Sequence, residues 1–600
     1  MEAAPQLPDP ATVDLTRTYD AIVVGSGAAG GMAAHVLTSR GLQVLLLEAG
    51  RHVDTTQSLK SMEWPYEHPR HGNLPPEYRV LDEGDYEKFQ PPYARHFGRY
   101  TNVVNWQQLG EGPDYTKDLF VNEKEHPYTG TKFSWVRSRA LGGKTNVWGR
   151  LALRMSEYDF KAASRDGYGD DWPISYDDVA PYYDKVDLYL GISGIKENLP
   201  WLPDSIYQRP MRLNEPEMHI RSRLEASGRV LTPFRLGVTT DGLKHNKYRS
   251  RCFGRGACQR RVGGCDINAA FNAQSGLIYP AFDTGRLTVR TNATVYEVRY
   301  DPRTNRASGV SFMDSITRKT YDAKAKVVVL GASTLETTRI LLNSTSKTFP
   351  AGLANSSGHL GHNLAEHVMG PRVEGIYKPR VGGERRNEDG RPGGFYIPRF
   401  QNLDAATKSK NFIRGYGLEG AGGQEMFPEL AVASTRGFGK DYKKAVRDHA
   451  GAYVYMYGLG EVLPRYENHV SLDPKVKDAY GIPVLRFAYE HGDNERKMCA
   501  DMTARMQEIF TDAGLEITRV KNDKLTEGSS VHEVGTARMG NDPKTSVLNA
   551  FQQAHDVRNL FVVDGAAFVS AGNQNPTWTI MALAWRACDY LAEELGKGNL

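Results

Sequence analysis

The chain has 600 residues, enough to bury a large core and to form more than one domain. Its 75 basic and 71 acidic residues nearly balance, so the charge gives no reason to expect nucleic acid or an anionic membrane as a partner. Five cysteines in a chain of this length do not make a disulfide scaffold.

No targeting or membrane segment is visible in the sequence. The first 15 residues lack the basic and apolar regions of a secretory signal. No apolar run approaches the roughly 20 residues that a membrane-spanning helix needs. We therefore expect a protein that does not span a membrane and that is cytoplasmic, or periplasmic if it is exported with a partner subunit.

Residues 19–50 predict a dinucleotide-binding turn. The apolar run from Ala21 to Val24 is typical of a buried parallel strand. A glycine-rich turn with the spacing G-x-G-x-x-G follows, and its residues include Gly25, Gly27, Ala28 and Gly30. Residues 31–39 then predict a helix, and residues 43–47 predict a second strand that leads into Glu48.

This order of strand, turn, helix and acidic residue has a physical reason. Glycines let the backbone turn sharply and approach a pyrophosphate, and the helix N-terminus supplies free N–H groups and a positive dipole end. Glu48, eighteen residues after Gly30, is suited to accept hydrogen bonds from ribose hydroxyls. The turn alone does not distinguish FAD from NAD.

The next segment, residues 51–130, contains seven tyrosines and many prolines but no sustained helical or strand period. A structureless stretch of this length inside a compact domain is often a functional loop or lid. The alternative is an insertion that only covers the surface. The sequence leaves both interpretations open.

A second glycine motif, RALGGKTNVWGR, occupies residues 139–150. Paired glycines followed by small polar residues suit a backbone that lies flat against a planar ligand. From Leu141 to Gly149 the motif resembles the flavin-contacting segment of the glucose-methanol-choline (GMC) family of FAD oxidoreductases. With Trp148 it is similar to the pyranose-oxidase and sugar-dehydrogenase branch of that family.

The resemblance implies that FAD lies against this segment. The implied contacts are Gly142, Gly143, Thr145, Asn146, Val147 and Trp148. In pyranose oxidases the residue before the tryptophan is a histidine bonded covalently to FAD. Because that residue is Val147 here, we expect FAD to be bound non-covalently.

Three of the five cysteines, Cys252, Cys258 and Cys265, fall within fourteen residues and among several arginines. Some dehydrogenases of the GMC family carry an iron–sulfur cluster near this point, and thiolates would suit one. The spacing lacks a C-x-x-C pair and a fourth cysteine, and zinc would face the same shortage even with His245. We favour reduced structural thiols over a cluster or a disulfide, and predict no metal site.

Residues 287–300 alternate like a pair of strands, and residues 326–331 predict a buried strand. They resemble the second nucleotide-domain segment of the family. The resemblance implies that the backbone at Val295 contacts adenine and that the loop at Ala332 and Ser333 passes close to the cofactor.

Residues 365–525 contain alternating stretches at 394–400, 452–459, 469–472 and 484–489, which together predict an antiparallel sheet. We interpret it as a substrate domain inserted into the nucleotide domain. The predicted fold class is α/β, with a Rossmann-type FAD-binding domain and this inserted sheet. The predicted division is 17–160, 241–345 and 529–600 for the FAD-binding domain, and 161–240 and 346–528 for the substrate domain.

The C-terminal region predicts a long amphipathic helix that starts near Pro576. Proline suits the first helical position, and Asn575 is placed to cap the N-terminus. The N-terminus of a helix favours negative charge. A reduced flavin carries such charge near N1 and the C2 carbonyl, so a helix directed there would favour reduction.

The same region completes the resemblance, which extends from residue 19 to about residue 596 and includes four separate motifs in the family's order. His532, in the motif VHEVGTARMG, and Asn575, in NQNPT, resemble the catalytic His/Asn pair of the GMC family. The implied FAD contacts are Asp564, Gly565, Asn575, Pro576 and Thr577. Neutral His532 would act as general base, Asn575 would hold the hydroxyl, and hydride would pass to flavin N5. Turnover should fall as the pH drops through the histidine pKa.

These features predict FAD-dependent oxidation of a secondary hydroxyl of a sugar or glycoside to a ketosugar, with electrons passed to a carrier. The wealth of tyrosine and tryptophan suits stacking on sugar faces. One alternative is an oxidase that reduces dioxygen to hydrogen peroxide. Another is a non-redox flavoprotein lyase. The expected partners are the sugar substrate, an electron acceptor or dioxygen, and a small partner subunit.

Overall fold

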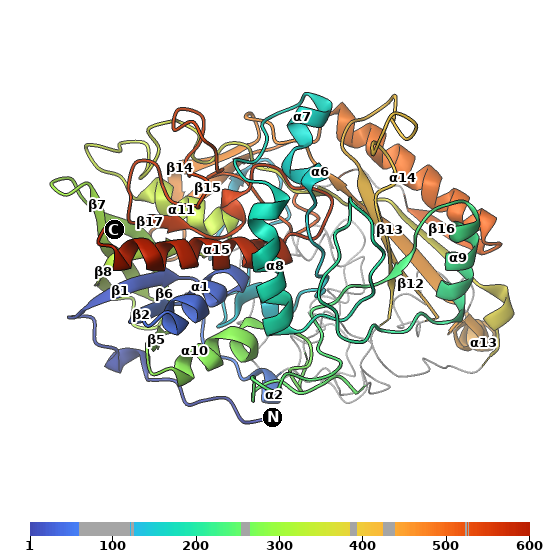
Figure 1. Cartoon of the computed structure of the whole chain (residues 1–600), viewed down its shortest axis with the longest axis horizontal. Coiled ribbons are helices and arrows are strands. Elements are labelled where there is room, and N and C mark those ends of the chain that lie inside the picture. Colours follow the sequence, from blue (N-terminus) through green and yellow to red (C-terminus); the bar gives the residue numbers. More distant parts are fainter. Residues whose placement is uncertain are drawn as a thin grey trace.

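The computed structural model describes residues 1–58, 121, 125–253, 265–383, 393–423, 438–449, 451–521, 525 and 527–600. Most of the predicted lid-like loop, and also Cys258, lie outside the described residues. Two large sheets lie at opposite ends of the described structure, and long helices connect and cover them (Figure 1).

The first sheet has seven strands in the order β5-β2-β1-β8-β7-β6, with β17 beside β8. Their bounds are β1 Thr18–Val24, β2 Val44–Leu47, β5 Leu287–Arg290, β6 Ala293–Asp301, β7 Arg306–Asp314, β8 Thr320–Leu330 and β17 Leu560–Val562. The pairings among β5, β2, β1, β8 and β17 are parallel, whereas β6 and β7 pair antiparallel. The strands at its centre are fully buried, as expected for parallel strands covered on both faces.

Helices α1 (Ala28–Ser39), α8 (Tyr176–Leu190) and α15 (Thr577–Gly596) pack against one another beside this sheet (Figure 1). Small residues fill most of α1, so its backbone comes close to its neighbours. The remaining helices near this end are η6 Gln274–Ile278, α10 Tyr279–Asp283 and α11 Thr334–Asn343. The α/β class with a Rossmann-type domain is therefore confirmed.

The second sheet has the order β16-β10-β13-β12-β11-β4, with β9 beside β13, and all these pairings are antiparallel. Its strands are β4 Thr232–Pro233, β9 His367–Val368, β10 Arg372–Ile376, β11 Phe395–Ile397, β12 Tyr416–Gly422, β13 Tyr453–Glu461 and β16 Glu516–Lys521. Helix α14 (Asp493–Asp512) covers it, and Met502 fits over Gly458, where a Cβ would lie 2.7 Å from the methionine sulfur. This is the antiparallel sheet expected for a substrate domain.

Two strand predictions were wrong about the partner. The stretches at 469–472 and 484–489 form β14 (His469–Lys477) and β15 (Pro483–Ala488), but these join β3 (Thr129–Gly130) in a separate sheet. Residues 287–300 do not form a strand pair, because β5 pairs with β2 and β6 pairs with β7. Alternation predicts a strand but carries no information about which strand lies beside it.

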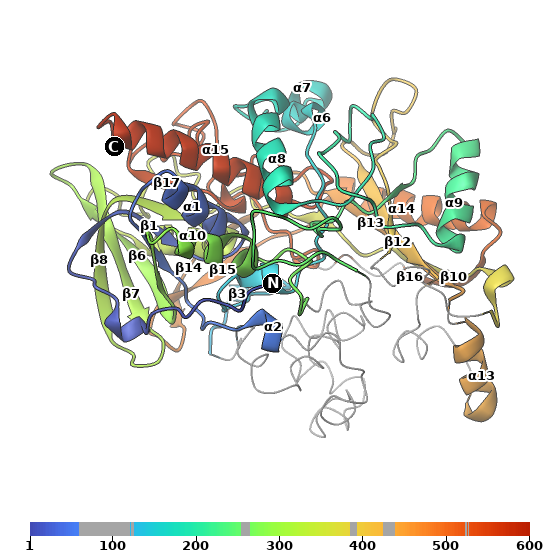
Figure 2. The same cartoon turned by 60° about the horizontal axis from the view of Figure 1, so that its bottom comes forward.

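The other helical elements are short or peripheral. They are η1 Pro10–Thr12, α2 Thr55–Ser58, η5 Gly143–Asn146, α6 Glu157–Phe160, α7 Ala162–Asp166, α9 Glu215–Ala226, η7 Lys378–Arg380, α13 Gly439–His449 and η8 Gly565–Ala567. Figure 2 shows α9, α13 and α14 around the second sheet, far from β8 and β17. Among the described helices, none combines the length and the apolar character needed to cross a bilayer. The predicted division of the chain into domain segments stays a prediction.

The contact between α1 and β1 gives the first testable prediction. A Cβ at Gly30 would lie 1.9 Å from the carbonyl oxygen of Gly25, which is backbone and cannot move aside. We expect Gly30→Ala to lower the free energy of unfolding by about 1–3 kcal/mol or more. Thermal unfolding followed by circular dichroism measures the loss.

The matched control is Gly596→Ala at the end of α15, where a Cβ would meet no atom within 4 Å. That substitution should be neutral or slightly stabilising, because alanine favours a helix over glycine by about 1 kcal/mol. Equal stability of the two variants would contradict the packing argument.

Candidate active site

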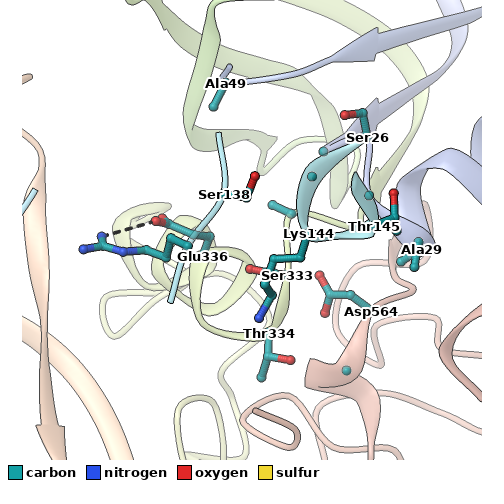
Figure 3. Close-up of a pocket in the computed structure, with 18 of the residues that line it drawn as sticks. Ser26, Ala29, Ala49, Ser138, Lys144, Thr145, Ser333, Thr334, Glu336 and Asp564 are labelled. Atoms are coloured by element: carbon teal, nitrogen blue, oxygen red, sulfur yellow. Dashed lines mark ion pairs between the residues drawn. The ribbon is translucent and has the colours of Figure 1, made fainter. Parts of the chain in front are cut away.

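One cavity brings together segments that are far apart in the sequence. Its walls come from the turn after β1, residues 137–148, the loop before α11, residues 531–533, the start of η8 and the N-terminus of α15 (Figure 3). The predicted residues that line it are Gly25, Gly27, Ala28, Glu48, Gly143, Thr145, Trp148, Val295, Ala332, His532, Asp564, Gly565, Pro576 and Thr577. The predicted residues that do not line it are Gly30, Gly142, Asn146, Val147 and Asn575.

Glu48 lines the cavity and is almost fully buried. Its Oε2 accepts hydrogen bonds from the backbone N–H of Ser26 (3.1 Å) and from the Ser26 hydroxyl (2.5 Å), and its Oε1 accepts from Gly50 N–H (2.8 Å). Burial raises the pKa of Glu48. These bonds fix the carboxylate at the cavity wall, and Oε1, which accepts from Gly50 N–H, keeps capacity to accept from a ligand hydroxyl.

The glycine motif around Gly142 is tied to the first turn. The Gly142 N–H donates to the Ser26 hydroxyl (2.9 Å), and the Asn146 amide donates to the Leu141 carbonyl (2.9 Å). Gly142 and Asn146 thus hold the loop so that Gly143 and Thr145 line the cavity. Val147 is buried behind this wall.

Asp564 is a buried carboxyl group at the same wall. It accepts hydrogen bonds from the Thr337 hydroxyl (2.5 Å) and from the backbone N–H of Ala566 (3.0 Å). Burial raises its pKa to about 6. The Thr337 hydroxyl also accepts from Ala332 N–H (3.2 Å), so Asp564 is linked to the loop that follows β8.

His532 lies beside a second histidine that the sequence analysis missed. Its Nδ1 is 3.1 Å from Nδ1 of His367 on β9, and the two rings stand at 84° with their centroids 5.0 Å apart. Burial lowers the pKa of His367 to about 4, and burial together with His367 and Lys144 lowers the pKa of His532 well below 6.5. Both rings are therefore neutral near pH 7, where one Nδ1 donates and the other accepts. No sequence motif singled out His367.

The turn before His532 is held by a buried carboxylate. Glu366 accepts hydrogen bonds from Gly528 N–H (2.6 Å) and from the Ser530 hydroxyl (2.9 Å). The Ser530 hydroxyl also accepts from the backbone N–H of His367 (3.2 Å). Glu366 thereby fixes the turn that leads into His532 and the strand that carries His367.

Asn575 does not cap α15. The N-cap of the helix is Pro576, in a helical conformation (φ −78°), and no side chain bonds to the first turn. The prediction of an Asn575 N-cap was wrong, because Pro576 lies one position before the first residue of the helix. In the described part of the chain, the buried Asn575 Oδ1 has no hydrogen-bond partner. An unsatisfied buried amide oxygen is costly, so its presence beside the cavity-lining Pro576 fits a bound ligand.

A cluster of arginines surrounds Glu336, another cavity residue that sequence reasoning missed. Its carboxylate lies 3.7 Å from Arg137, 3.8 Å from Arg139 and 3.6 Å from Arg339. Although burial opposes the charge, these arginines hold the pKa of Glu336 below its ordinary value. The three guanidinium groups outnumber this carboxylate, so this wall suits an anionic ligand.

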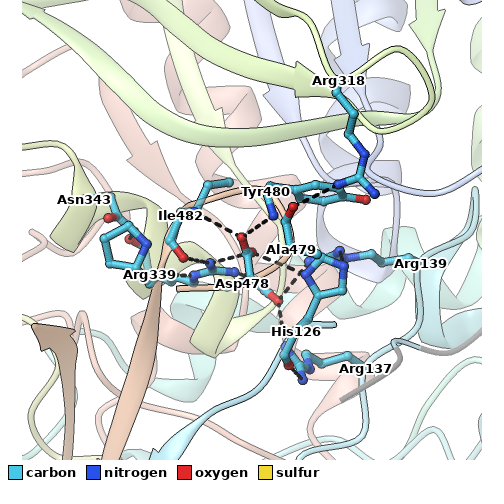
Figure 4. A network of polar contacts seen from close by, with 12 residues as sticks. His126, Arg137, Arg139, Arg318, Arg339, Asn343, Asp478, Ala479, Tyr480 and Ile482 are labelled. Atoms are coloured by element: carbon cyan, nitrogen blue, oxygen red, sulfur yellow. Dashed lines mark hydrogen bonds and ion pairs between the residues drawn. The ribbon is translucent and has the colours of Figure 1, made fainter. Parts of the chain in front are cut away.

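A polar network behind the wall keeps these arginines in place (Figure 4). Asp478 accepts a hydrogen bond from Arg339 (2.7 Å) and lies 3.3 Å from Nδ1 of His126. Nε2 of His126 lies 3.0 Å from Arg139, and its carbonyl accepts from Arg137 (2.6 Å). The network joins segments that no sequence period relates.

Two of the three clustered cysteines lie in the described part of the chain. Cys252 and Cys265 are buried, while Cys258 lies outside the described residues. In the part of the chain that the structure describes, no group of three histidine, cysteine or acidic side chains could hold a metal ion. The choice between thiols and a cluster at these cysteines stays a prediction.

Comparison with known proteins decides the family. A family model described as GMC oxidoreductase matches residues 19–369, and a C-terminal model with the same description matches residues 464–584. The chain belongs to the GMC oxidoreductase family. It is thus an FAD-dependent oxidoreductase that acts on CH–OH groups, as the motifs predicted, and the buried acceptors Glu48 and Asn575 Oδ1 fit such a cofactor and substrate.

Similar proteins extend over nearly the whole chain. It is 28% identical to 2-methyl-1,2-propanediol dehydrogenase of Mycolicibacterium austroafricanum, over 96% of this chain and 95% of that protein. It is 27% identical to the fructose dehydrogenase large subunit of Gluconobacter japonicus, over 97% and 99%. It is 24% identical to paromamine 6'-oxidase of Streptomyces fradiae, over 97% and 93%. Among solved structures, pyridoxine 4-oxidase from Mesorbium loti has the same fold, with a TM-score of 0.58 and 16% identity over 96% and 99% of the two chains.

The ion pairs of His491 beside the turn before His532 make the free energy of unfolding depend on pH. His491 lies 3.5 Å from Glu366 and 3.7 Å from Glu527, and although burial opposes the charge, these carboxylates raise its pKa to about 9. A group whose pKa is raised on folding contributes stability below its ordinary value of 6.5, and this contribution is lost as the pH rises through 9. We expect His491→Gln to lose roughly 1–3 kcal/mol at pH 6 and much less at pH 10.

Urea unfolding at a series of pH values measures this difference. The matched control is His469→Gln, a half-buried histidine on β14. If His491→Gln costs the same stability at pH 6 and pH 10, the ion-pair interpretation is wrong.

Proposed function

We propose that this protein oxidises a secondary hydroxyl of a sugar or glycoside to a ketone, with FAD as cofactor and electrons passed on to a carrier. The observation that carries the proposal is that neutral His532, in contact with buried His367, lines the same cavity as the glycine turn and the start of α15. Relatives named for fructose and paromamine support a sugar or glycoside as the substrate.

The cavity residues divide into three groups along its length. Glu48 and Val295 are suited to the adenosine end, where the carboxylate accepts from ribose hydroxyls. The turn at Gly25 and Gly27, with the N-terminus of α1, is suited to the pyrophosphate. Residues Thr145, Trp148 and Thr577, together with His532, are left for the ring system. FAD, when bound, supplies the hydride acceptor.

The histidine pair determines which nitrogen can act as the base. If the His532 Nδ1–H donates to Nδ1 of His367, Nε2 of His532 carries the lone pair. Nε2 can then take the proton of the substrate hydroxyl. His367 holds the ring in the tautomer that the reaction needs, as a partner on the other nitrogen does in catalytic triads.

Asn575 and α15 complete the site in this proposal. The Asn575 amide, whose Oδ1 has no hydrogen-bond partner among the described residues, is available to hold the reacting hydroxyl in line with the base. The N-terminus of α15 at Pro576 and Thr577 favours negative charge in the cavity. Both features suit a reaction in which the substrate loses a proton and the cofactor gains charge.

Replacing the base tests the proposal directly. We expect His532→Ala to retain FAD but to reduce the rate of flavin reduction by the alcohol about 10²–10⁴-fold, because the proton acceptor is lost. Anaerobic stopped-flow bleaching of the flavin measures it, across a panel of sugars, glycosides and small diols. In the wild-type protein the rate should fall only well below pH 6.5, where His532 becomes protonated.

His555→Ala is the matched control, since His555 bonds to Ser546 and does not line the cavity. Its flavin should be reduced at the wild-type rate. Full flavin reduction in His532→Ala would end the assignment of the base. Failure of every alcohol in the panel to bleach the wild-type flavin would favour a non-redox flavoprotein lyase.

We also propose that FAD is bound without a covalent bond. Val147 occupies the position of the histidine that carries the covalent bond in pyranose oxidases, and a valine side chain has no nucleophile. Acid denaturation followed by filtration should therefore release all of the yellow colour into the filtrate. Colour that stays with the precipitated protein would contradict the proposal.

The similarity to proteins named as oxidases supports a second candidate for the electron acceptor. In that case dioxygen takes the electrons and hydrogen peroxide forms. A peroxide assay in air, run beside reduction of a dye without air, distinguishes the two. The similarity to a fructose dehydrogenase large subunit supports the predicted small partner subunit, which would receive the electrons or assist export.

The second sheet and the residues around it are suited to form the substrate domain. In this proposal residues 161–240 and 346–528 cover the cofactor and supply His367, while 17–160, 241–345 and 529–600 bind it. The proposal is supported by the position of β9, which carries His367 at the edge of the second sheet and places it against His532.

A further inference from the structure

Lys144 and Glu533 form an ion pair inside the cavity, with Nζ 3.0 Å from Oε2. Lys144 directly follows Gly143 on η5, and Glu533 directly follows His532. Both side chains line the cavity, and Figure 3 shows Lys144 in its middle, close to Ser333 and Thr334. The pair therefore joins the glycine motif to the segment of the base.

The contacts of Lys144 flank His532 on both sides. Besides Glu533, the ammonium donates to the carbonyl of Val531 at 3.4 Å. The Glu533 carbonyl in turn accepts from the Thr334 hydroxyl (2.6 Å). Because Val531 has a positive φ of 56°, the backbone here adopts a conformation that its own sequence does not favour. These contacts hold the segment in place.

The burial of the two charges differs. The Glu533 side chain is 5% exposed, whereas that of Lys144 is 34% exposed. Glu533 Oε1 is buried and finds no hydrogen-bond partner among the residues that the structure describes, although Oε2 is paired. A buried carboxylate with a free oxygen on a cavity wall is an acceptor that bound hydroxyl groups can satisfy.

These charges act on His532 at short range. Among the described residues, the titratable groups that act on His532 are His367 on β9 and Lys144 on η5, and Glu533 is paired with Lys144. The carboxylate of Glu366, next to His367, is engaged by Gly528 and Ser530 instead. The positive charge of Lys144 opposes protonation of His532, and the negative charge of Glu533 offsets the charge of Lys144 with which it is paired.

We propose that Lys144 and Glu533 are positioning residues that hold the 531–533 segment and balance the charge around His532, so that the base stays free to accept a proton. The inference rests on the proposed function of His532. Lys144, the lysine of the glycine motif, has no role in the proposed reaction itself. The inference gives this residue a role in positioning the base. Both charges line the cavity that would hold FAD, so they would also bear on how readily a bound flavin takes up electrons.

Opposite shifts from the two partners test the inference. In Lys144→Met, His532 should be easier to protonate, so the acid limb of the flavin-reduction rate should move to higher pH. In Glu533→Gln it should be harder to protonate, so the limb should move to lower pH. Lys144→Arg keeps the charge and should keep the wild-type limb. A limb shift of one pH unit corresponds to about a tenfold change in the rate on the acid side.

A second measurement needs no alcohol substrate. The midpoint potential of the bound FAD, measured by equilibration with a reference dye, should fall in Lys144→Met and rise in Glu533→Gln, because loss of a positive charge disfavours electron uptake. The matched control is Lys326→Met, which removes a lysine paired with Asp20 (2.8 Å) at the exposed end of β8. It should change neither the limb nor the potential.

The outcomes separate this inference from the proposed function. The inference is overturned if the acid limb of the flavin-reduction rate and the midpoint potential both stay at their wild-type values in Lys144→Met and Glu533→Gln. The ion pair would then have only a structural role, even if flavin reduction were slower. If Lys144→Met loses FAD, Glu533→Gln alone decides by the direction of its shifts. If no alcohol reduces the wild-type flavin, the proposed function fails, and the potentials still decide whether the pair controls charge in the cavity.

Discussion

The backbone contact of Gly25, Gly30 and Gly331 determines where the cavity lies. A Cβ at Gly25 would be 2.5 Å from the Gly331 carbonyl oxygen, and one at Gly331 would be 2.8 Å from the Gly30 nitrogen. Only glycines allow α1 to approach the ends of β1 and β8 so closely. This approach directs the N-terminus of α1 at the cavity and leaves the turn free to contact a pyrophosphate. The other cavity walls pack around this turn and the N-terminus of α1.

The cavity wall that carries His532 contains charged side chains that are paired within the protein. Glu366 is balanced by His491 and by N–H groups of the 528–530 turn, and Glu533 is balanced by Lys144. Buried charges are costly unless they are paired and hydrogen-bonded, so these groups constrain the backbone that carries His532. The wall is thereby kept rigid where a base must be positioned, and polar where a substrate and a cofactor bring hydroxyl groups.

Local sequence patterns predicted where strands and helices form better than they predicted which strands pair. Strands β1 and β2 and helix α1 lie within a few residues of their predicted bounds. By contrast, β14 and β15 belong to a separate sheet and not to the predicted one, and Asn575 does not cap α15. Strand alternation and capping preferences are local, whereas pairing depends on which surfaces meet in the folded chain. A helix boundary shifted by one residue was enough to free the Asn575 side chain.

The sequence by itself determined the glycine turn with Glu48, the flavin-type motif at 141–149 and the family, because these depend on residue types at short, fixed spacings. Tertiary structure alone decided that His367, 165 residues before His532, would lie against it. It also decided that Lys144 would reach Glu533 across 389 residues, and that Arg137 and Arg139 would lie beside Glu336. Such contacts depend on how two sheets and their loops pack together, and no local period in the chain encodes them.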